Sequence, residues 1–210
     1  MRDVSTGPTG MSGVVLAGGK STRFGSDKAS ALLRGRPMLD WVVAAVGEVC
    51  DEVVVVHAPG QRLPTIAASV RLAVDDVPGE GPLAGLIAGF RTATAPVCFL
   101  TSCDVPLVRP ALIAAVGGAL ARSDATAVAP MTEGRLQPLL GAYLRLKTLE
   151  AAEALFAVGE RSLQAVLRRV GARALPDAVV VEADRDLLSF RNANDQATLE
   201  AIVRELEGDD

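Results

Sequence analysis

Residues 13–29 read GVVLAGGKSTRFGSDKA, an apolar run that changes abruptly into a polar loop. The first five of these residues are apolar and rich in valine, which indicates a short buried strand. Three glycines and three cations mark the loop that follows: Gly18, Gly19, Gly25, Lys20, Arg23 and Lys28. Glycine lets the backbone approach a ligand, and Lys and Arg form charge-assisted hydrogen bonds to phosphate oxygens. The segment therefore predicts a strand that runs into a polyphosphate-binding loop.

This loop matches neither of two common phosphate-binding motifs. A P-loop ending in Gly19-Lys20-Ser21 would need glycine at position 14, which is Val14. A dinucleotide-binding GxGxxG that started at Gly18 would need glycine at position 20, which is Lys20. A solvated basic connection between a strand and a helix is the alternative interpretation. The cations close to the glycines favour a phosphate site of another kind.

Strand patterns alternate with helical patterns along the rest of the chain. After Pro37, apolar residues recur at helical spacing, whereas the valine run at 52–56 indicates a strand buried on both faces. Further strands are expected at 70–74, 97–100, 125–129, 139–143 and 178–181. Further helices are expected at 83–93, from Pro110 onward, at 144–158, at 162–170 and around 199–206. This alternation predicts an α/β fold with a mainly parallel central sheet.

No internal repeat or long linker divides the chain. We therefore expect one domain over residues 13–207, preceded by a flexible tail at residues 1–12 that is rich in Gly, Pro, Ser and Thr.

The composition limits the classes of function. The chain has 210 residues, of which 50% are hydrophobic, and its 21 Lys and Arg against 25 Asp and Glu give a formal net charge of −4. Without a cationic surplus, and with 3% aromatic residues, it is a poor match for a nucleic-acid-binding protein. No apolar run reaches the ~20 residues of a membrane span, and the first residues lack a secretory signal pattern. Three cysteines without a C-x-x-C pair favour the cytoplasm.

Two further strand ends carry acidic residues. Asp75 and Asp76 follow the strand expected at 70–74, and Asp104 follows the strand expected at 97–100. Ligands of open α/β sheets bind beyond the carboxyl ends of the strands, and Mg²⁺ takes one or two carboxylates together with substrate phosphates. Each aspartate also suits a turn ahead of a proline. Together with the cationic loop, however, Asp104 favours a metal–triphosphate site.

Histidine and asparagine add weaker signals. His57 is the single histidine, which excludes a His-rich zinc site, and its place at a strand end favours a ligand contact or a plain structural role. Asn194 or Asp195 is expected to cap the last helix, although Asn194 could also complete a metal shell.

The loop motif resembles the signature LAGGxSxR-hydrophobic-GxDK of molybdenum cofactor guanylyltransferases. The resemblance covers about residues 13–205 and continues through GPLAG at 81–85, CDVP at 103–106 and Asn192-Ala-Asn194. It implies a Rossmann-like three-layer α/β/α sandwich of the nucleotide-diphospho-sugar transferase-like superfamily. It also implies transfer of GMP from GTP to molybdopterin carrying molybdenum, with release of pyrophosphate and formation of the guanine dinucleotide cofactor.

The resemblance also implies roles for the loop. It places four consecutive backbone positions against guanine, ribose and phosphate: Leu16, Ala17, Gly18 and Gly19. Arg23 and Lys28 would contact the triphosphate and act as catalytic residues with Asp104, which would hold Mg²⁺.

Three more positions would belong to the nucleotide site. Asp75 would lie in it, and Gly85 would let the following loop approach the nucleotide. His57 stands where family members often carry asparagine, so the contact there departs from the family pattern.

The second substrate is expected to use the less regular half of the chain. The nucleotide half would span about residues 13–130 and the acceptor half about residues 131–207. Four polar residues are candidate acceptor contacts: Arg135, Gln137, Asn192 and Asn194. Protein partners implied by the family are molybdenum-insertion proteins and apo-molybdoenzymes or their chaperones.

Three other functions remain open. The closest is a CTP-dependent molybdopterin cytidylyltransferase, whose members tend to carry Ala-Ala-Gly where this chain has Ala17-Gly18-Gly19. Another phosphate-acceptor nucleotidyltransferase is a further enzymatic alternative. A non-catalytic molybdopterin carrier would need a pterin pocket but not Asp104.

Overall fold

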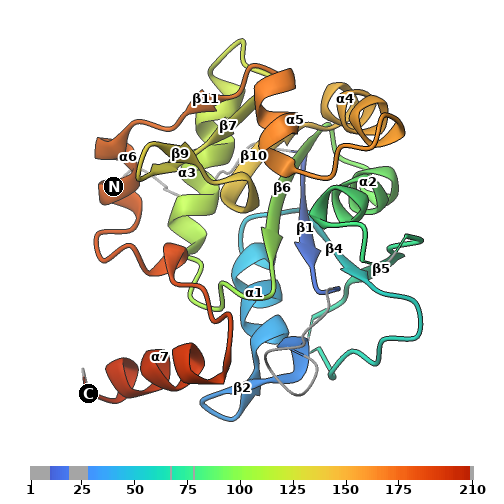
Figure 1. Ribbon diagram of the computed structural model, residues 1–210. Helices are drawn as coiled ribbons and strands as arrows, with labels where there is room; N and C mark the ends of the chain where they lie inside the picture. The colour runs from blue at the N-terminus through green and yellow to red at the C-terminus, as the bar shows by residue number, and fades with distance from the viewer. Residues whose placement is uncertain (1–9, 19–27, 67, 78, 209–210) are drawn as a thin grey trace.

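The computed structural model describes residues 10–18, 28–66, 68–77 and 79–208, and a twisted sheet runs through its centre (Figure 1). Seven strands form this sheet in the order β11-β7-β10-β6-β1-β4-β5. In chain order they are β1 (Met11–Leu16), β4 (Glu52–His57), β5 (Arg71–Val74), β6 (Val97–Ser102), β7 (Ala127–Ala129), β10 (Gly141–Leu144) and β11 (Arg173–Ala174). Apart from β10, the paired strands of this sheet are parallel.

The register of β1 fixes the middle of the sheet. Val14 pairs with Val54 of β4 on one side and with Leu100 of β6 on the other. Strand β10 runs antiparallel between β6 and β7, with Ala142 opposite both Phe99 and Val128. The mainly parallel sheet expected from the sequence is confirmed.

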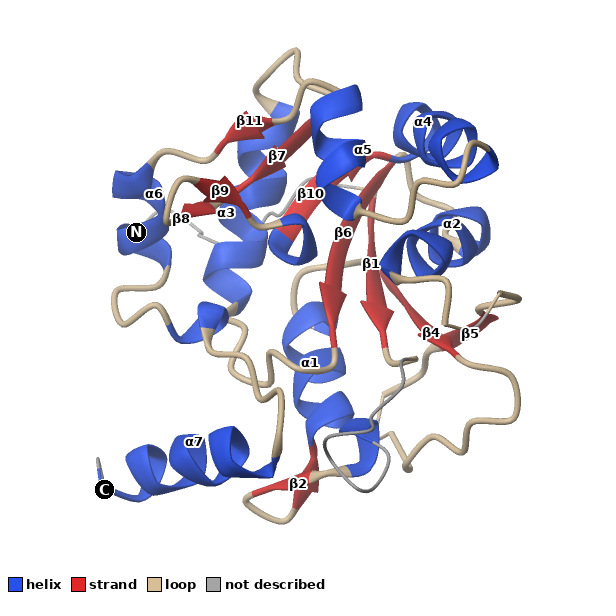
Figure 2. Ribbon diagram, in the orientation of Figure 1, coloured by secondary structure: helices blue, strands red, loops and turns tan. Residues whose placement is uncertain are grey.

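Helices cover both faces of the sheet (Figure 2). In chain order they are α1 (Met38–Gly47), α2 (Pro82–Thr92), α3 (Pro110–Ala121), α4 (Arg145–Ala157), α5 (Leu163–Arg169), α6 (Asp177–Ala183) and α7 (Gln196–Gly208). Helices α1, α3 and α6 pack on one face, and α2, α4 and α5 pack on the other. These three layers are the expected α/β/α sandwich.

Alternation along β1 explains why its residues 13–16 are all apolar. Met11 and Val15 join the core cluster under α1 and α3, whereas Val14 and Leu16 join the cluster under α2. A strand covered on both faces has no solvent side, so successive residues are apolar rather than alternating.

Helix α7 lies apart from both layers and covers a small third cluster. Leu199 and Ile202 of α7 pack there with Leu33 and Met38. Leu33 belongs to a short hairpin of β2 (Leu32–Leu33) and β3 (Arg36–Pro37). This packing holds the chain just before α7 near the start of α1.

Two sequence expectations about the elements need correction. Residues 178–181 form part of α6 instead of a strand, because β11 already occupies that edge of the sheet and α6 packs on α3. Pro176 at the helix N-cap and Asp177 in the first turn suit this helix. Strand β1 begins at Met11, so residues 11 and 12 belong to the sheet rather than to the tail.

Candidate active site

Asp104 lies two residues beyond β6, at the carboxyl edge of the sheet. The Ser102 hydroxyl donates a hydrogen bond to Asp104 Oδ1, while the Lys28 ammonium lies 3.0 Å from Asp104 Oδ2. The Asp104 side chain is 22% exposed and that of Lys28 is 16% exposed. The carboxylate is thus held from two sides but stays open to a ligand.

The Lys28 ammonium joins two distant segments of the chain. Besides Asp104, it donates a hydrogen bond to Asn194 Oδ1 at 3.2 Å. The backbone supports this arrangement, since the Ala193 amide donates to the Asp104 carbonyl at 2.8 Å and Ala193 is fully buried. Asp195, rather than Asn194, caps α7 by accepting from the Thr198 amide at 2.8 Å. Three predicted site residues therefore meet at one point.

The oxygen atoms around Lys28 fit a magnesium ion. A carboxylate of Asp104 and the amide oxygen of Asn194 converge on one cation, the ammonium group. Hard divalent cations prefer such oxygen donors, and Mg²⁺ completes its shell with waters and substrate phosphates. Within the described residues there is no group of three or more His, Cys, Asp or Glu side chains that could hold a metal. Asp104 and Asn194 would hold Mg²⁺ only with help from a bound phosphate.

The backbone at the end of β1 is tightly held. Ala17 and Gly18 both donate to the Val56 carbonyl, at 2.8 and 3.2 Å. A side chain at Gly18 would place its Cβ 3.1 Å from the Ala58 nitrogen, so glycine lets the two strand ends touch. Leu16 is buried as the last residue of β1. Gly19 and Arg23 lie outside the described residues.

His57 and Asp75 lie at the ends of β4 and β5. His57 Nδ1 is 2.9 Å from the Ala58 carbonyl, and the His57 carbonyl accepts from the Asp75 amide at 2.8 Å. Asp75 Oδ1 in turn accepts from the Val77 amide at 3.1 Å, which is a turn contact. With ~4.8 Å between strands, β5 lies roughly 14 Å across the sheet from β6, so a ligand reaching both Asp75 and Asp104 must be extended.

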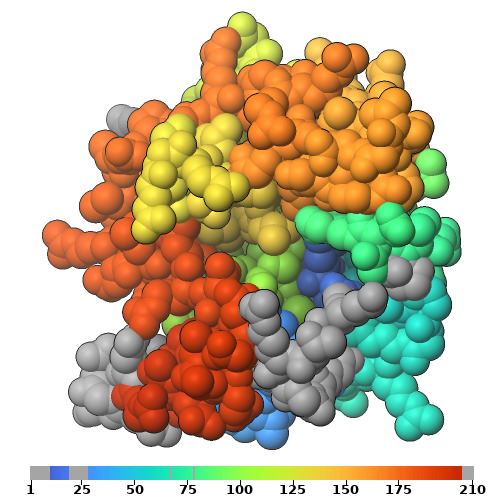
Figure 3. Space-filling view, viewed as in Figure 1, coloured from blue at the N-terminus to red at the C-terminus, as the bar shows by residue number. Residues whose placement is uncertain are grey.

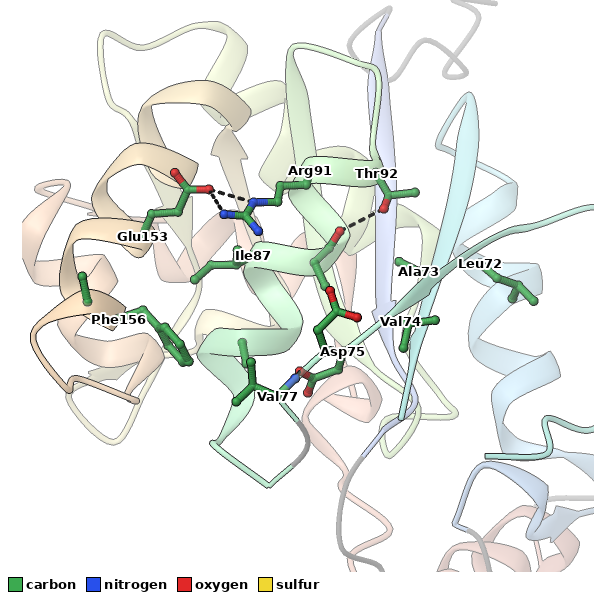
Figure 4. Close-up of a pocket in the computed structure, with 14 residues that line it drawn as sticks. Leu72, Ala73, Val74, Asp75, Val77, Ile87, Arg91, Thr92, Glu153 and Phe156 are labelled. Atoms are coloured by element: carbon green, nitrogen blue, oxygen red, sulfur yellow. Dashed lines mark hydrogen bonds and ion pairs between the residues drawn. The ribbon is translucent and has the colours of Figure 1, made fainter. Parts of the chain in front are cut away.

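Asp75 also borders a cavity of about 500 Å³ beside β5, α2 and α4 (Figure 4). An ion pair between Arg91 and Glu153 crosses it, with the Arg91 Nη2 atom 2.7 Å from the carboxylate. Gly85 lies inside α2, within the helix expected at 83–93, and a Cβ there would be 3.1 Å from a methyl group of Leu16. The observed contact of Gly85 therefore joins a helix to β1.

A second cavity, of about 480 Å³, opens next to Asp104. Figure 3 shows the viewed face hollowed near its centre, between the yellow, orange and red parts of the chain. The cavity is lined by Asp104, Val105, Thr132, Glu133, Gln137, Pro138, Leu139, Leu140, Ser189, Phe190 and Asn192. Two of the four predicted acceptor contacts, Gln137 and Asn192, thus share a cavity with Asp104. Arg135 is exposed on β9 (Arg135–Leu136) and does not line it, and Asn194 contacts Lys28 instead.

The cysteines lie in the buried part of the molecule. Cys50, Cys98 and Cys103 are all buried, and none of the three is in a disulfide. Burial, with a smaller contribution from Asp51, raises the pKa of Cys50 to about 12, and burial also raises the pKa of Cys98. Thiols with raised pKa values are poor nucleophiles at neutral pH.

Comparison with known proteins identifies the family. The model of the MobA-like NTP transferase domain matches residues 13–185. The chain belongs to this family. A probable molybdenum cofactor guanylyltransferase of Chloroflexus aggregans is 39% identical over 163 residues, covering 73% of this chain and 74% of that protein. The molybdenum cofactor guanylyltransferase of Desulfosudis oleivorans is 33% identical over 191 residues, covering 90% of this chain and 93% of that protein.

Solved structures share the fold of this MobA-like domain. Molybdopterin-guanine dinucleotide biosynthesis protein A from Archaeoglobus fulgidus superposes with a TM-score of 0.80 at 22% identity, over 94% of this chain and all of that chain. A nucleotidyl transferase from Methanothermobacter thermautotroptrophicus gives a TM-score of 0.68 at 19% identity, over 96% of this chain and 100% of that chain. The Rossmann-like fold and the nucleotidyltransferase class expected from the sequence are confirmed. In the described part of the MobA-like domain, each helix is too short or too polar to cross a bilayer.

Sequence reasoning missed part of the second cavity in this MobA-like transferase. Thr132 and Glu133 belong to a hairpin of β8 (Met131–Thr132) and β9, whose turn has positive φ at both Glu133 and Gly134. A two-residue turn ending in glycine is a hairpin signal, so Glu133-Gly134 could have revealed it. Ser189 and Phe190 lie in a short 3₁₀ segment without such a signal.

Proposed function

We propose that this protein transfers GMP from GTP to molybdopterin carrying molybdenum, releasing pyrophosphate and forming the guanine dinucleotide cofactor. The observation that carries the proposal is the meeting of Lys28, Asp104 and Asn194 beside a cavity large enough for a second substrate. Support for these two substrates comes from the names of the relatives and from the motif that begins at Leu16.

The reaction would require positioning and charge compensation. A terminal phosphate oxygen of molybdopterin would attack the α-phosphorus of GTP, forming one P–O bond while the bond to the departing pyrophosphate breaks. This phosphate is already ionised near neutral pH, so the chain needs no general base. Lys28 would leave Asp104 Oδ2 and donate to the phosphate oxygens, where its charge offsets the repulsion between two anions.

Asp104 and Asn194 would keep the metal-bound triphosphate at the sheet edge. Mg²⁺, when bound, would supply positive charge to the phosphates during transfer. Ser102 would keep the Asp104 carboxylate oriented through the hydrogen bond to Oδ1. Gln137 and Asn192 would contact the acceptor in the cavity that they share with Asp104.

The choice of guanine is favoured by Gly18. Cytidylyltransferases of this kind tend to carry alanine at this position, and a Cβ there would approach the Ala58 nitrogen to 3.1 Å. The close contact of the two strand ends thus suits the glycine pair of guanylyltransferases. Such an enzyme would work in the cytoplasm, where molybdenum-insertion proteins and apo-molybdoenzymes or their chaperones would be its partners.

A direct assay tests the proposal. Purified protein is mixed with Mg²⁺, molybdate-loaded molybdopterin and GTP, CTP, UTP or ATP in separate reactions, and the dinucleotide product is identified by mass. We expect product with GTP alone. Product with CTP alone would make the protein a cytidylyltransferase, and cofactor maturation by Asp104→Ala in a deficient strain would favour a carrier.

A further inference from the structure

Gln61 bridges the ends of two strands of the central sheet. Its side-chain Nε2 donates to the Ala17 carbonyl at 3.0 Å, and its Oε1 accepts from the Ala58 amide at 3.0 Å. Ala17 follows the last residue of β1, and Ala58 follows the last residue of β4. One half-buried amide thus connects both loops on which the nucleoside is proposed to lie.

This bridge completes the bonding of two peptide groups. The Ala17–Gly18 peptide is held at its oxygen by Gln61 and at its nitrogen by the Val56 carbonyl, 3.2 Å away. The His57–Ala58 peptide is held at its nitrogen by Gln61 and at its oxygen by the Asp75 amide, 2.8 Å away. Neither peptide can rotate without breaking one of these bonds, so the ends of β1 and β4 keep a fixed orientation and separation.

The chemistry of the bridge requires an amide. Ala17 offers an acceptor and Ala58 a donor, so the bridging group must donate at one atom and accept at the other. An ionised glutamate could accept from Ala58 but would repel the Ala17 carbonyl. A methionine of similar length would make neither bond.

We infer that Gln61 is a positioning residue that sets nucleobase selectivity by fixing the Ala17–Gly18 and His57–Ala58 peptides. It acts through these peptides rather than by touching the nucleotide. The inference rests on the proposed function, since it assumes that the nucleoside lies against the ends of β1 and β4.

The test compares nucleotide binding by wild type, Gln61→Met and Gln61→Glu in the presence of Mg²⁺ and without acceptor. Dissociation constants for GTP, CTP, UTP and ATP are measured by calorimetry. The selectivity is the dissociation constant of each of the other three nucleotides divided by that of the nucleotide that wild type prefers. Gln61→Met loses both hydrogen bonds and Gln61→Glu loses the one to Ala17, so this ratio should narrow by at least ~10-fold in both variants.

Thr94→Val is the matched control for lost stability. Thr94 donates to Glu52 Oε1 at the opposite end of the sheet, so this variant should lower the melting temperature without changing the selectivity. Unchanged selectivity in Gln61→Met and Gln61→Glu would overturn the role of Gln61. If wild type prefers CTP, guanine is the wrong base. The effect of Gln61 is then still measured, as the change in the preference for CTP. A wild-type protein that binds none of the four nucleotides would overturn both proposals.

Discussion

The Lys28 ammonium lies 3.0 Å from Asp104 Oδ2, although 76 positions in the sequence separate the two residues. The two opposite charges offset each other in a partly buried place, where an unpaired charge would be costly. The same cation lies where a nucleoside triphosphate would bring negative charge. Lys28 is therefore a partner of Asp104 before the substrate binds and a partner of the phosphates afterwards.

Removing the Lys28 ammonium should lower the turnover rate. A single preorganised donor to a developing anion contributes about 3–4 kcal/mol, so Lys28→Ala should lower kcat at least ~100-fold with GTP and Mg²⁺. Initial rates of pyrophosphate release measure this. Lys147→Ala makes the same change at an exposed position of α4 and should leave kcat unaltered. A Lys28→Ala rate close to that of wild type would rule out the role given to Lys28.

Removing the Ser102 hydroxyl should weaken metal binding. Groups that orient a metal-binding side chain typically change metal affinity 10–100-fold, so Ser102→Ala should raise the Mg²⁺ concentration for half-maximal activity at least ~10-fold. Ser102→Thr keeps the hydroxyl and should restore most of the affinity. Ser123→Ala removes a hydroxyl that bonds the Leu120 carbonyl at the end of α3 and should have no effect. An unchanged Mg²⁺ requirement in Ser102→Ala would mean that Asp104 needs no orienting partner.

A methyl group at Gly89 should destabilise the fold. An added Cβ would come within 2.3 Å of Val14 Cγ1 and 3.0 Å of Val56 Cγ2, so α2 could no longer pack closely on the sheet. Overpacking of this kind costs about 1–3 kcal/mol, and Gly89→Ala should lower the free energy of unfolding accordingly in urea titrations.

Gly118→Ala provides the contrast for Gly89→Ala within another helix. The atoms nearest to its Cβ would be those at the flexible end of Arg122, so helix propensity should raise the free energy of unfolding by up to about 1 kcal/mol. Equal effects of the two substitutions would contradict the packing argument.

Glu52 should make the stability depend on acidic pH. Burial alone raises the pKa of Glu52, but hydrogen bonds from Ser12, Thr94 and Arg71 outweigh it and lower the pKa from 4.5 to about 2. Because the folded protein binds this proton less readily than the unfolded chain, the stabilisation is present above pH 4.5 and is lost as the pH falls toward 2. Glu52→Gln should therefore show a shallower fall of melting temperature between pH 5 and 2 than wild type shows. Parallel curves would exclude this contribution.

Short continuous apolar runs predicted the sheet well because most of its strands are buried on both faces. Val53–Val56 form part of β4, as their sequence predicts, whereas the three valines of residues 179–181 are part of α6. Tertiary packing outweighed the local β propensity of these valines, because β11 occupies the edge of the sheet and α3 provides a surface on which α6 packs. Strand propensity is a weak guide once the available sheet positions are taken.

The candidate site was only partly readable from the sequence. Asp104 and Lys28 could be found because strand ends and cationic loops have recognisable patterns. Gln61 has no such pattern, since its role depends on the distance between the ends of β1 and β4. The antiparallel placement of β10 was equally hidden, because the alternation of apolar residues says nothing about strand direction.

The position of β10 between β6 and β7 has a consequence for synthesis on the ribosome. Residues 141–144 are added after β6 and β7, so the nascent chain carries β6 with one unpaired side until they emerge. Exposed strand edges invite pairing with other chains. Chaperones that shield this edge during translation would protect the chain until β10 pairs with β6 and β7.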